Sequence, residues 1–289
     1  MTSVAQVLSV GTKQLTDSGI EDARSEACGL LAHVMNLNKA QVFARTDEEL
    51  DAQVVGAFEL GVKERAAGKP FAHITGKREF WSMPLQVSPA TLIPRPDTET
   101  VLELVTEVFN DREAPRNILD LGTGSGCLLL ALLNIFQKAN GIGLDISREA
   151  ISVANRNVDC LGLSDRAQMI CGSWHDAIDG QFDLIVSNPP YIPTDDIPSL
   201  DRSVRDHEPH LALDGGSKGL DAYHYLIPMS VNLLRSDGIL VVEIGIDQAN
   251  DVAEIAAQSG FAQYRVRRDL SGIERALSFY KKDVGISQG

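Results

Sequence analysis

A glycine-rich turn in the middle of the chain has residue types that let a ligand lie against the backbone. It reads Asp120-Leu121-Gly122-Thr123-Gly124-Ser125-Gly126 and includes the end of the apolar run Ile118–Leu121. Glycine permits a tight turn, and the unpaired N–H groups of a following helix favour a polar or anionic group. The spacing is G-x-G-x-G. It departs from the dinucleotide fingerprint, which needs glycine where Cys127 stands, and it lacks the G-K-[ST] ending of a phosphate-binding loop.

An acidic residue, Asp145, closes the next apolar segment, which begins at Gly141. In open α/β sheets, ligands bind outside the carboxyl ends of the strands. A carboxylate at that place can accept hydrogen bonds from both ribose hydroxyls of a nucleoside. The glycine turn and the acid together therefore predict a site for a nucleoside cofactor. The alternative is a structural turn in which Asp145 caps the following helix.

The tetrapeptide Asn188-Pro189-Pro190-Tyr191 follows the apolar run 184–187 and is the most informative short motif of the chain. The two prolines stiffen the backbone. The Asn188 side chain and the Pro189 carbonyl offer two acceptors for the hydrogens of a planar –NH2 group, and Tyr191 offers a flat ring to stack on it. The motif predicts a site that binds an amino or amide group. The alternative is a turn rich in proline.

Neither a metal site nor a disulfide is expected. The segment His207-Glu208-Pro209-His210 has ligand-type side chains, but no further ligand set accompanies it, so we interpret it as a polar loop. The four cysteines form no C-x-x-C pair, which favours reduced thiols in a cytosolic protein. They are Cys28, Cys127, Cys160 and Cys171.

The elements that must position these residues fall into two kinds. Residues 1–73 are predicted to be helical, with one apolar stripe from Ala23 to Val34 and a second helix starting at Thr46, where Glu49 completes a capping-box pattern. Residues 74–96 alternate at Leu85 and Val87 and are rich in proline, which predicts a connecting strand or hairpin. Residues 97–289 form the remaining domain.

Short apolar runs alternate with helical stretches from residue 117 onward. This alternation predicts an α/β fold with a mostly parallel sheet that helices cover on both faces. The expected strands are Ile118–Leu121, Ile142–Leu144, Gln168–Cys171, Phe182–Val186, Ile239–Ile244, Tyr264–Val266 and Leu277–Tyr280. The expected helices are Leu128–Phe136, Arg148–Cys160, Ala222–Leu234 and Asp251–Ala257.

Charge and hydropathy narrow the classes of partner. The 289 residues include 26 Lys plus Arg and 40 Asp plus Glu, a net charge of −14. Nucleic acids bind basic surfaces, so this balance disfavours a direct nucleic-acid target. No apolar run is long enough for a membrane span, and the first residues lack the features of a signal peptide, so we expect a cytoplasmic protein.

The motifs resemble those of the S-adenosylmethionine-dependent amino-methyltransferases, and within them the peptide chain release factor glutamine methyltransferases. The resemblance covers most of the chain and is weakest in the amino-terminal helices. Its stretches are Arg78–Trp81, Val87–Glu99, the glycine turn, Ser187–Tyr191 and Glu208–Leu213. It implies a Rossmann-like methyltransferase sheet, mostly parallel with its last strand antiparallel, beside a small amino-terminal helical domain.

The resemblance also implies roles for residues. It implies binding of S-adenosyl-L-methionine, with S-adenosyl-L-homocysteine as the product, by Gly122, Thr123, Gly124, Ser125, Gly126, Asp145, Trp174 and Asn188. Asn188, Pro189 and Tyr191 are the implied catalytic residues, and Asn188, Pro189, Pro190 and Tyr191 the implied substrate-binding residues. Without the resemblance, Trp174 would be interpreted as a core aromatic residue.

The implied reaction is methylation of the side-chain amide of the glutamine in the Gly-Gly-Gln motif of release factors, with residues 1–73 recognising the protein substrate. Two other hypotheses stay open. An adenine-N6 or cytosine-N4 nucleic-acid methyltransferase could use the same tetrapeptide on a flipped base, although the charge balance argues against it. A binding module without activity could keep the fold, although the complete motif set argues against that.

Overall fold

The computed structural model describes residues 2–173, 178 and 180–282. The chain divides into two compact units. The first contains residues 1–77 and 201–207, and the second contains residues 78–200 and 208–289. Within the described residues, every helix is too short or too polar to cross a membrane.

The first unit is a cluster of helices, as the sequence predicts. Its small two-stranded sheet pairs β1 (Thr2–Ser3) with β2 (Glu49–Leu50). Its helices are α1 (Val4–Asp17), α2 (Ala23–Met35), α3 (Lys39–Phe43), α4 (Ala52–Ala66), α5 (Phe71–Thr75) and α9 (Arg202–Arg205). Apolar side chains from the first four helices form one buried core, which includes Val7, Leu15, Leu31, Val42 and Phe58.

The predicted start of a helix at Thr46 is wrong. Helix α4 begins only at Ala52, and its cap is Asp51, whose side chain accepts a hydrogen bond of 2.8 Å from the Val54 N–H. Glu49, which the capping box would need at the start of a helix, pairs instead with Ser3 of the amino-terminal strand, and Leu50 pairs with Thr2. Pairing with the amino-terminal strand therefore replaces the capping box that the pattern suggests.

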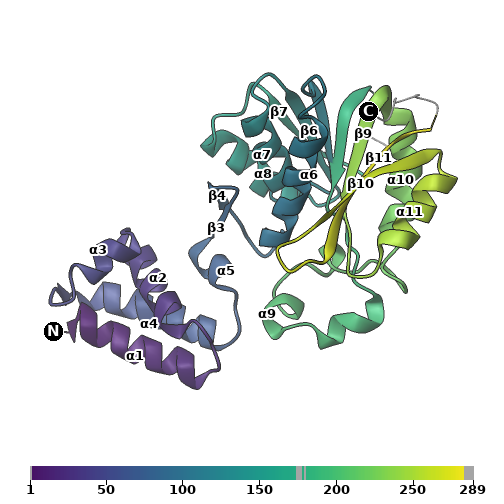
Figure 1. Cartoon of the computed structure of the whole chain (residues 1–289). Coiled ribbons are helices and arrows are strands. Elements are labelled where there is room, and N and C mark those ends of the chain that lie inside the picture. The colour runs from purple at the N-terminus through teal and green to yellow at the C-terminus, as the bar shows by residue number, and fades with distance from the viewer. Residues whose placement is uncertain (1, 174–177, 179, 283–289) are drawn as a thin grey trace. The chain divides into compact units, whose positions relative to one another are not determined.

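The second unit is built on a seven-stranded sheet with the order β10-β11-β9-β8-β5-β6-β7 (Figure 1). The strands are β5 (Asn117–Leu121), β6 (Asn140–Asp145), β7 (Ala167–Cys171), β8 (Phe182–Ser187), β9 (Leu234–Glu243), β10 (Phe261–Arg268) and β11 (Glu274–Lys281). Neighbours from β7 to β9 are parallel, and β11 is antiparallel to both β9 and β10. The predicted fold class is confirmed, including the antiparallel last strand.

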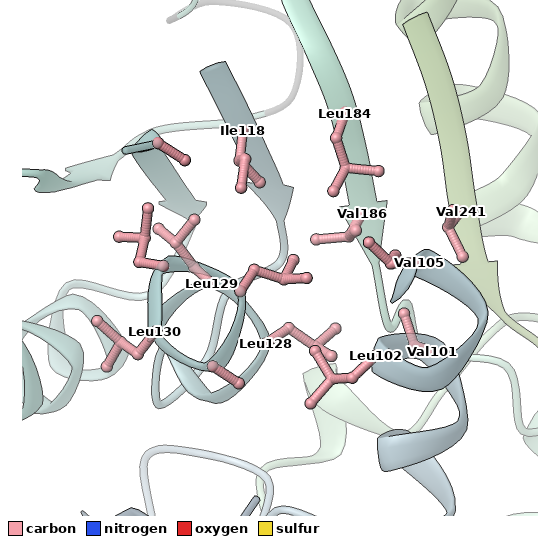
Figure 2. Packing of buried hydrophobic residues seen from close by; sticks show 14 of the residues in the cluster. Val101, Leu102, Val105, Ile118, Leu128, Leu129, Leu130, Leu184, Val186 and Val241 are labelled. Atoms are coloured by element: carbon pink, nitrogen blue, oxygen red, sulfur yellow. The ribbon is translucent and has the colours of Figure 1, made fainter. Parts of the chain in front are cut away.

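Helices cover both faces of this sheet because successive strand residues point to opposite sides. One face packs against α6 (Glu99–Val108), α7 (Cys127–Ile135) and α8 (Arg148–Cys160). Figure 2 shows the side chains of α6 and α7 against those of β5, β8 and β9. The other face packs against α10 (Asp221–Leu233) and α11 (Ala249–Gln258).

A hairpin and three short 3-10 helices complete the described residues of this unit. Strands β3 (Lys77–Phe80) and β4 (Met83–Gln86) form the hairpin, which confirms the predicted strand or hairpin at Leu85. Phe80, Met83 and Leu85 belong to the core beneath α6 and α7. The 3-10 helices are η1 (Pro96–Thr98), η2 (Thr194–Ser199) and η3 (His210–Ala212).

Candidate active site

A cavity of about 600 Å³ lies at the carboxyl ends of β5, β6 and β8. These strands are neighbours and parallel, so the residues that follow them converge at one edge of the sheet. The volume is in the range of small-molecule and cofactor sites. Its walls include Thr98, Asp120, Gly122, Thr123, Gly124, Ser125, Asp145, Ser173, Asn188, Pro190, Leu211 and Tyr225.

The glycine turn lies open along one wall of the cavity. Gly122 and Gly124 have positive φ angles of 75° and 56°, and no atom lies within 4 Å of the point where a Cβ would be attached. Two consecutive N–H groups, of Gly122 and Thr123, donate to the Leu144 carbonyl at 2.8 and 2.9 Å. The turn is therefore held against β6 while its backbone faces open space, which suits close approach of a ligand.

Asp145 ends β6 and holds the glycine turn to the start of α8. Its Oδ2 accepts a hydrogen bond from the Gly124 N–H at 2.8 Å, and its Oδ1 accepts one from the Ser147 N–H at 2.9 Å. Burial raises the pKa of this carboxyl, and the backbone hydrogen bonds oppose that rise. Since a carboxylate has about four acceptor positions, both oxygens keep a lone pair for a ligand.

Asp120 is a buried acid in the same wall. The Thr123 hydroxyl donates to its Oδ2 at 2.7 Å, whereas Oδ1 has no hydrogen-bond partner among the described residues. Burial raises the pKa of Asp120 to about 7. The buried Ser125 hydroxyl also lacks a partner in the described part of the chain. Sequence reasoning counted Asp120 among the motif residues but assigned it no binding role, although an acid at a strand end beside a glycine turn is the available signal.

Asn188 reaches the cavity from the end of β8. Its side-chain Nδ2 donates a hydrogen bond of 3.1 Å to the Thr98 hydroxyl, and its Oδ1 accepts none from the described residues. Pro190 also lines the cavity, but Pro189 and Tyr191 are not among its lining residues. The structure therefore brings Asn188 together with the glycine turn and Asp145.

Tyr191 points to a buried acid of a neighbouring strand. Its hydroxyl donates to Glu243 Oε1 at 3.1 Å, and its carbonyl accepts a hydrogen bond of 2.9 Å from Gln248 Nε2. A Cβ on Gly219 would lie 2.1 Å from the Tyr191 carbonyl oxygen, so only glycine fits beneath it. These contacts hold the backbone of the tetrapeptide in place.

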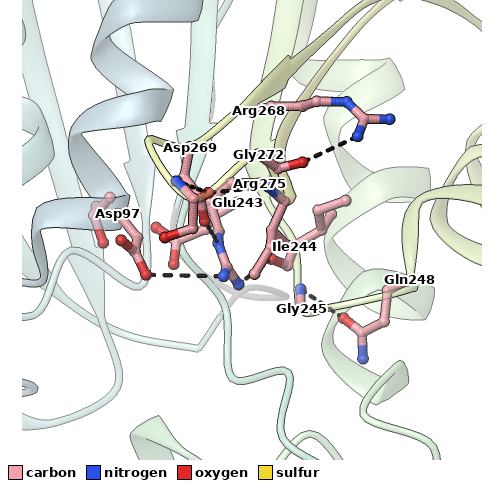
Figure 3. Close-up of polar contacts among 12 residues, drawn as sticks. Asp97, Glu243, Ile244, Gly245, Gln248, Arg268, Asp269, Gly272 and Arg275 are labelled. Atoms are coloured by element: carbon pink, nitrogen blue, oxygen red, sulfur yellow. Dashed lines mark hydrogen bonds and ion pairs between the residues drawn. The ribbon is translucent and has the colours of Figure 1, made fainter.

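Glu243 ends β9 and is fully buried. Burial raises its pKa to about 7, opposed by the nearby Thr98 hydroxyl, by the hydrogen bond from Tyr191 and by the charge of Arg275, while Glu243 Oε2 has no hydrogen-bond partner among the described residues. Figure 3 shows Glu243 close to Arg275, which itself donates to Asp269 at 3.1 Å and lies 3.8 Å from a carboxylate oxygen of Asp97. Sequence reasoning missed Glu243 and Thr98, because no local spacing connects them with the tetrapeptide.

Two further polar residues support the walls of the cavity. Glu208 accepts hydrogen bonds from the Ile93 N–H and from the Arg95 guanidinium, which hold these two residues in place. Buried Asn157 donates to the Ser125 carbonyl at 2.9 Å. Glu208 therefore takes part in an internal ion pair. The predicted adenine-side residue Trp174 lies outside the described residues, while its neighbour Ser173 lines the cavity.

Comparisons with known proteins cover nearly the whole chain. The family model "PrmC N-terminal domain" matches residues 6–76, and the model "Methyltransferase domain" matches residues 113–261. A protein named release factor glutamine methyltransferase from Bradyrhizobium diazoefficiens is 42% identical over 271 residues, which cover 93% of this chain and 91% of that protein. A protein of the same name from Moorella thermoacetica is 40% identical over 97% of this chain and 99% of its own length.

Solved structures share the fold of the second unit at low sequence identity. The hMettl16 catalytic domain, solved with an RNA hairpin, aligns with a TM-score of 0.56 at 16% identity and covers 78% of this chain and 84% of that chain. A methyltransferase from Pyrococcus furiosus aligns with a TM-score of 0.53 at 18% identity and covers 68% of this chain and 88% of that chain. These likenesses support the Rossmann-like methyltransferase architecture.

Proposed function

The chain belongs to the release factor glutamine methyltransferases, and we propose that it methylates the side-chain amide nitrogen of the glutamine in the Gly-Gly-Gln motif of peptide chain release factors, using S-adenosylmethionine. One observation carries this proposal furthest. Asn188 places a side-chain oxygen without a hydrogen-bond partner among the described residues in the cavity that the glycine turn and Asp145 also line. An acceptor for an amide N–H thus lies beside a pocket suited to a nucleoside.

The described residues fit S-adenosylmethionine in three respects. The backbone of Gly122–Gly126 is open to the cavity, as the methionine end requires. Asp120 Oδ1, buried and without a partner among the described residues, suits the cationic amino group of that end. Asp145 keeps lone pairs for the ribose hydroxyls. Ser173 and Trp174 are proposed for the adenine side. When bound, this cofactor supplies an electrophilic methyl group on a sulfonium.

The chemical difficulty is that an amide nitrogen is a weak nucleophile, because its lone pair is delocalised into the carbonyl. Asn188 Oδ1 and the Pro189 carbonyl are proposed to accept the two amide hydrogens, which places electron density on nitrogen and orients its lone pair. Such preorganised orientation can contribute ~7–11 kcal/mol relative to free reactants. The nitrogen becomes acidic after methylation and its proton then leaves, so no strong general base is needed beforehand.

Pro190 and Tyr191 complete the proposed substrate site. Pro190 forms part of the cavity wall. The Tyr191 hydroxyl is held by Glu243, so its ring is fixed in place at the edge of the tetrapeptide. Stacking of this ring on the substrate amide stays a prediction.

The protein substrate requires more contact surface than one glutamine provides. Stable protein–protein contacts bury ~800 Å² per partner. We propose that residues 1–73 select the release factor, that residues 74–96 connect, and that residues 97–289 carry the transfer of the methyl group. The match of residues 6–76 to a domain model of this family supports a separate module. Release factors are accordingly the proposed partners, in the cytoplasm and without a direct nucleic-acid target.

The test is a comparison of methyl acceptors with the full chain and S-adenosylmethionine labelled on the methyl group. A purified release factor should take up label, and the same factor with the motif glutamine changed to alanine should not. Adenine- and cytosine-containing oligonucleotides should take up none. Label in the oligonucleotides but not in the release factor would replace this proposal with the nucleic-acid alternative.

A further inference from the structure

Large apolar side chains on the surface of the second unit gather at one edge of its sheet. Single exposed apolar residues are normal on a protein surface, so it is their common location that calls for an explanation. Five of the six exposed ones among the described residues of this unit, all except Val266, lie in segments at the edge that carries the cavity. The six are Ile146, Leu211, Tyr225, Ile246, Val266 and Leu270.

The topology of the chain accounts for this location. Ile146 and Ile246 come shortly after the carboxyl ends of β6 and β9. Leu270 lies in the turn between β10 and β11, and this turn is beside the carboxyl end of β9 because β11 runs antiparallel to β9. Helix α10 leads into the amino end of β9, so the start of this helix, which carries Tyr225, lies at the carboxyl edge.

Three of the five side chains line the cavity itself, namely Ile146, Leu211 and Tyr225. Ile146 directly follows Asp145, the residue proposed for the ribose, so we assign it to the cofactor side. Leu211 of η3 and Tyr225 of α10 are 62% and 56% exposed although they belong to the cavity wall. They therefore lie where the cavity opens to solvent, and together they form the rim.

The backbone around Leu211 is held next to the tetrapeptide 188–191. The Leu213 carbonyl accepts a hydrogen bond of 3.0 Å from the N–H of Ile192, the residue that follows the tetrapeptide. On the other side of Leu211, Glu208 is held by its hydrogen bonds to the segment 93–95. The side chain is thus exposed on a backbone that is fixed on both sides, so a partner need not order this segment when it binds.

The helix that carries Tyr225 is joined to the same place. The Ile192 carbonyl accepts a hydrogen bond of 2.9 Å from the Gly215 N–H. The Gly215 carbonyl in turn accepts one of 2.9 Å from the N–H of Asp221, the first residue of α10. The next residue in the helix after Tyr225, Leu226, is fully buried in the core of the second unit. Both members of the rim are therefore tied to the segment that follows the proposed substrate site.

We propose that the rim is a docking surface for the stretch of release factor chain that flanks the methylated glutamine. The inference rests on the proposed function. A glutamine that enters the cavity as part of a protein brings its neighbours in the chain to the opening, where the rim lies. Burial of two exposed apolar side chains against that chain is favourable, and their fixed backbone keeps the entropic cost low. The glycines before the glutamine have no side chain to hold the two surfaces apart.

The experiment measures steady-state methylation of an intact release factor and of a short Gly-Gly-Gln peptide at saturating S-adenosylmethionine. Leu211→Ala and Tyr225→Ala should each lower kcat/KM about tenfold on both acceptors, because full burial of such a side chain contributes more than that. On the intact factor the loss should lie in KM, with kcat changed less than about threefold. An equal loss on the peptide distinguishes the rim from residues 1–73, whose removal should largely spare the peptide.

Conservative variants and a control at another site isolate the apolar contact. Leu211→Met and Tyr225→Phe keep the apolar surface and should stay within about threefold of the wild-type kcat/KM on both acceptors. Val266→Ala is the matched control, because Val266 is an exposed apolar residue within β10 that does not line the cavity. Its kcat/KM should equal that of the wild type.

Three results would overturn the inference. The first is an unchanged kcat/KM in both alanine variants. The second is a Kd for S-adenosylmethionine raised more than about tenfold with an unchanged KM for the release factor, which would assign the rim to the cofactor. The third is a wild-type dimer, seen by sedimentation, that dissociates in the alanine variants while kcat/KM stays unchanged, which would assign the edge to a second copy of the chain. None of these results affects the proposed function, which fails only if the wild-type enzyme does not methylate the release factor.

Discussion

Substitution of Asp145 tests two roles of one carboxylate, in holding the fold and in binding the cofactor. The carboxylate accepts one hydrogen bond from the glycine turn, at Gly124, and one from the start of α8, at Ser147. If it also accepts from the ribose of the cofactor, then its substitution must affect both stability and affinity. The two variants Asp145→Asn and Asp145→Ala remove these contacts to different degrees.

The size of each effect follows from the hydrogen bonds. A hydrogen bond to a charged group contributes roughly 1.5–3 kcal/mol when buried. Because Asp145 is partly exposed, we expect Asp145→Ala to lower the free energy of unfolding by about 1–3 kcal/mol for the two lost backbone contacts together. Loss of a ribose contact of the same kind should raise the Kd for S-adenosylmethionine about 10- to 100-fold. Asp145→Asn keeps one oxygen and should lie between the wild type and Asp145→Ala in both quantities.

The assay combines urea unfolding with calorimetric titration of S-adenosylmethionine on the same preparations. Asp159→Asn is the matched control, because Asp159 lies on the neighbouring helix α8, is exposed and does not line the cavity. Its Kd should equal that of the wild type. A folded Asp145→Ala variant that binds the cofactor with wild-type Kd would refute the reasoning and leave Asp145 as a purely structural link between turn and helix.

Three more predictions follow from the same structure. Asn188→Ala should slow single-turnover methyl transfer on the order of 100-fold or more while the variant stays folded, since a preorganised polar contact is lost; an unchanged rate would reduce the tetrapeptide to a turn. A shortened chain that starts at Phe71 should still bind S-adenosylmethionine but lose most of its kcat/KM on intact release factor and much less on a Gly-Gly-Gln peptide; equal losses would place the helices in the catalytic architecture. Asp120→Asn should flatten the pH dependence of the free energy of unfolding. Burial raises the pKa of Asp120 to about 7 from 3.8. Its contribution to stability is therefore full below about pH 4 and lost as the pH rises through about 7, by up to ~4 kcal/mol. Urea unfolding at about pH 5 and pH 8 checks this, and equal pH dependence in variant and wild type would contradict it.

The sheet of the second unit was predictable because its signals are local. Strands such as Ile118–Leu121 and Phe182–Val186 are buried on both faces and appear as short apolar runs. Helix α6 was not predicted, although its buried stripe from Val101 to Val108 has helical spacing, because the prolines just before it dominate the pattern. The predicted start at Thr46 failed for the opposite reason, since a strand partner distant in sequence competes with a local cap.

In the candidate site, too, residues with a local sequence signal were predicted, and residues brought in by tertiary contacts were not. Asp145 and Asn188 each follow an apolar strand directly, so their convergence at one edge follows from the parallel order of the strands. Thr98 and Glu243 are near Asn188 only through tertiary folding, and no spacing in the sequence connects them. The hydrogen bond from the Tyr191 hydroxyl to Glu243 is likewise a tertiary contact. The sequence suggested only an aromatic ring at this position and gave no sign of a partner for its hydroxyl.

Mass spectrometry of a release factor after incubation with the enzyme and S-adenosylmethionine tests the central claim most directly. The peptide that contains the Gly-Gly-Gln motif should gain the mass of one methyl group, and fragmentation should place it on the glutamine side chain. The Asn188→Ala enzyme, shown to bind the cofactor, should leave the peptide unmodified over the same time. An unmodified motif peptide with the wild-type enzyme, or a methyl group on any other residue, would contradict the account.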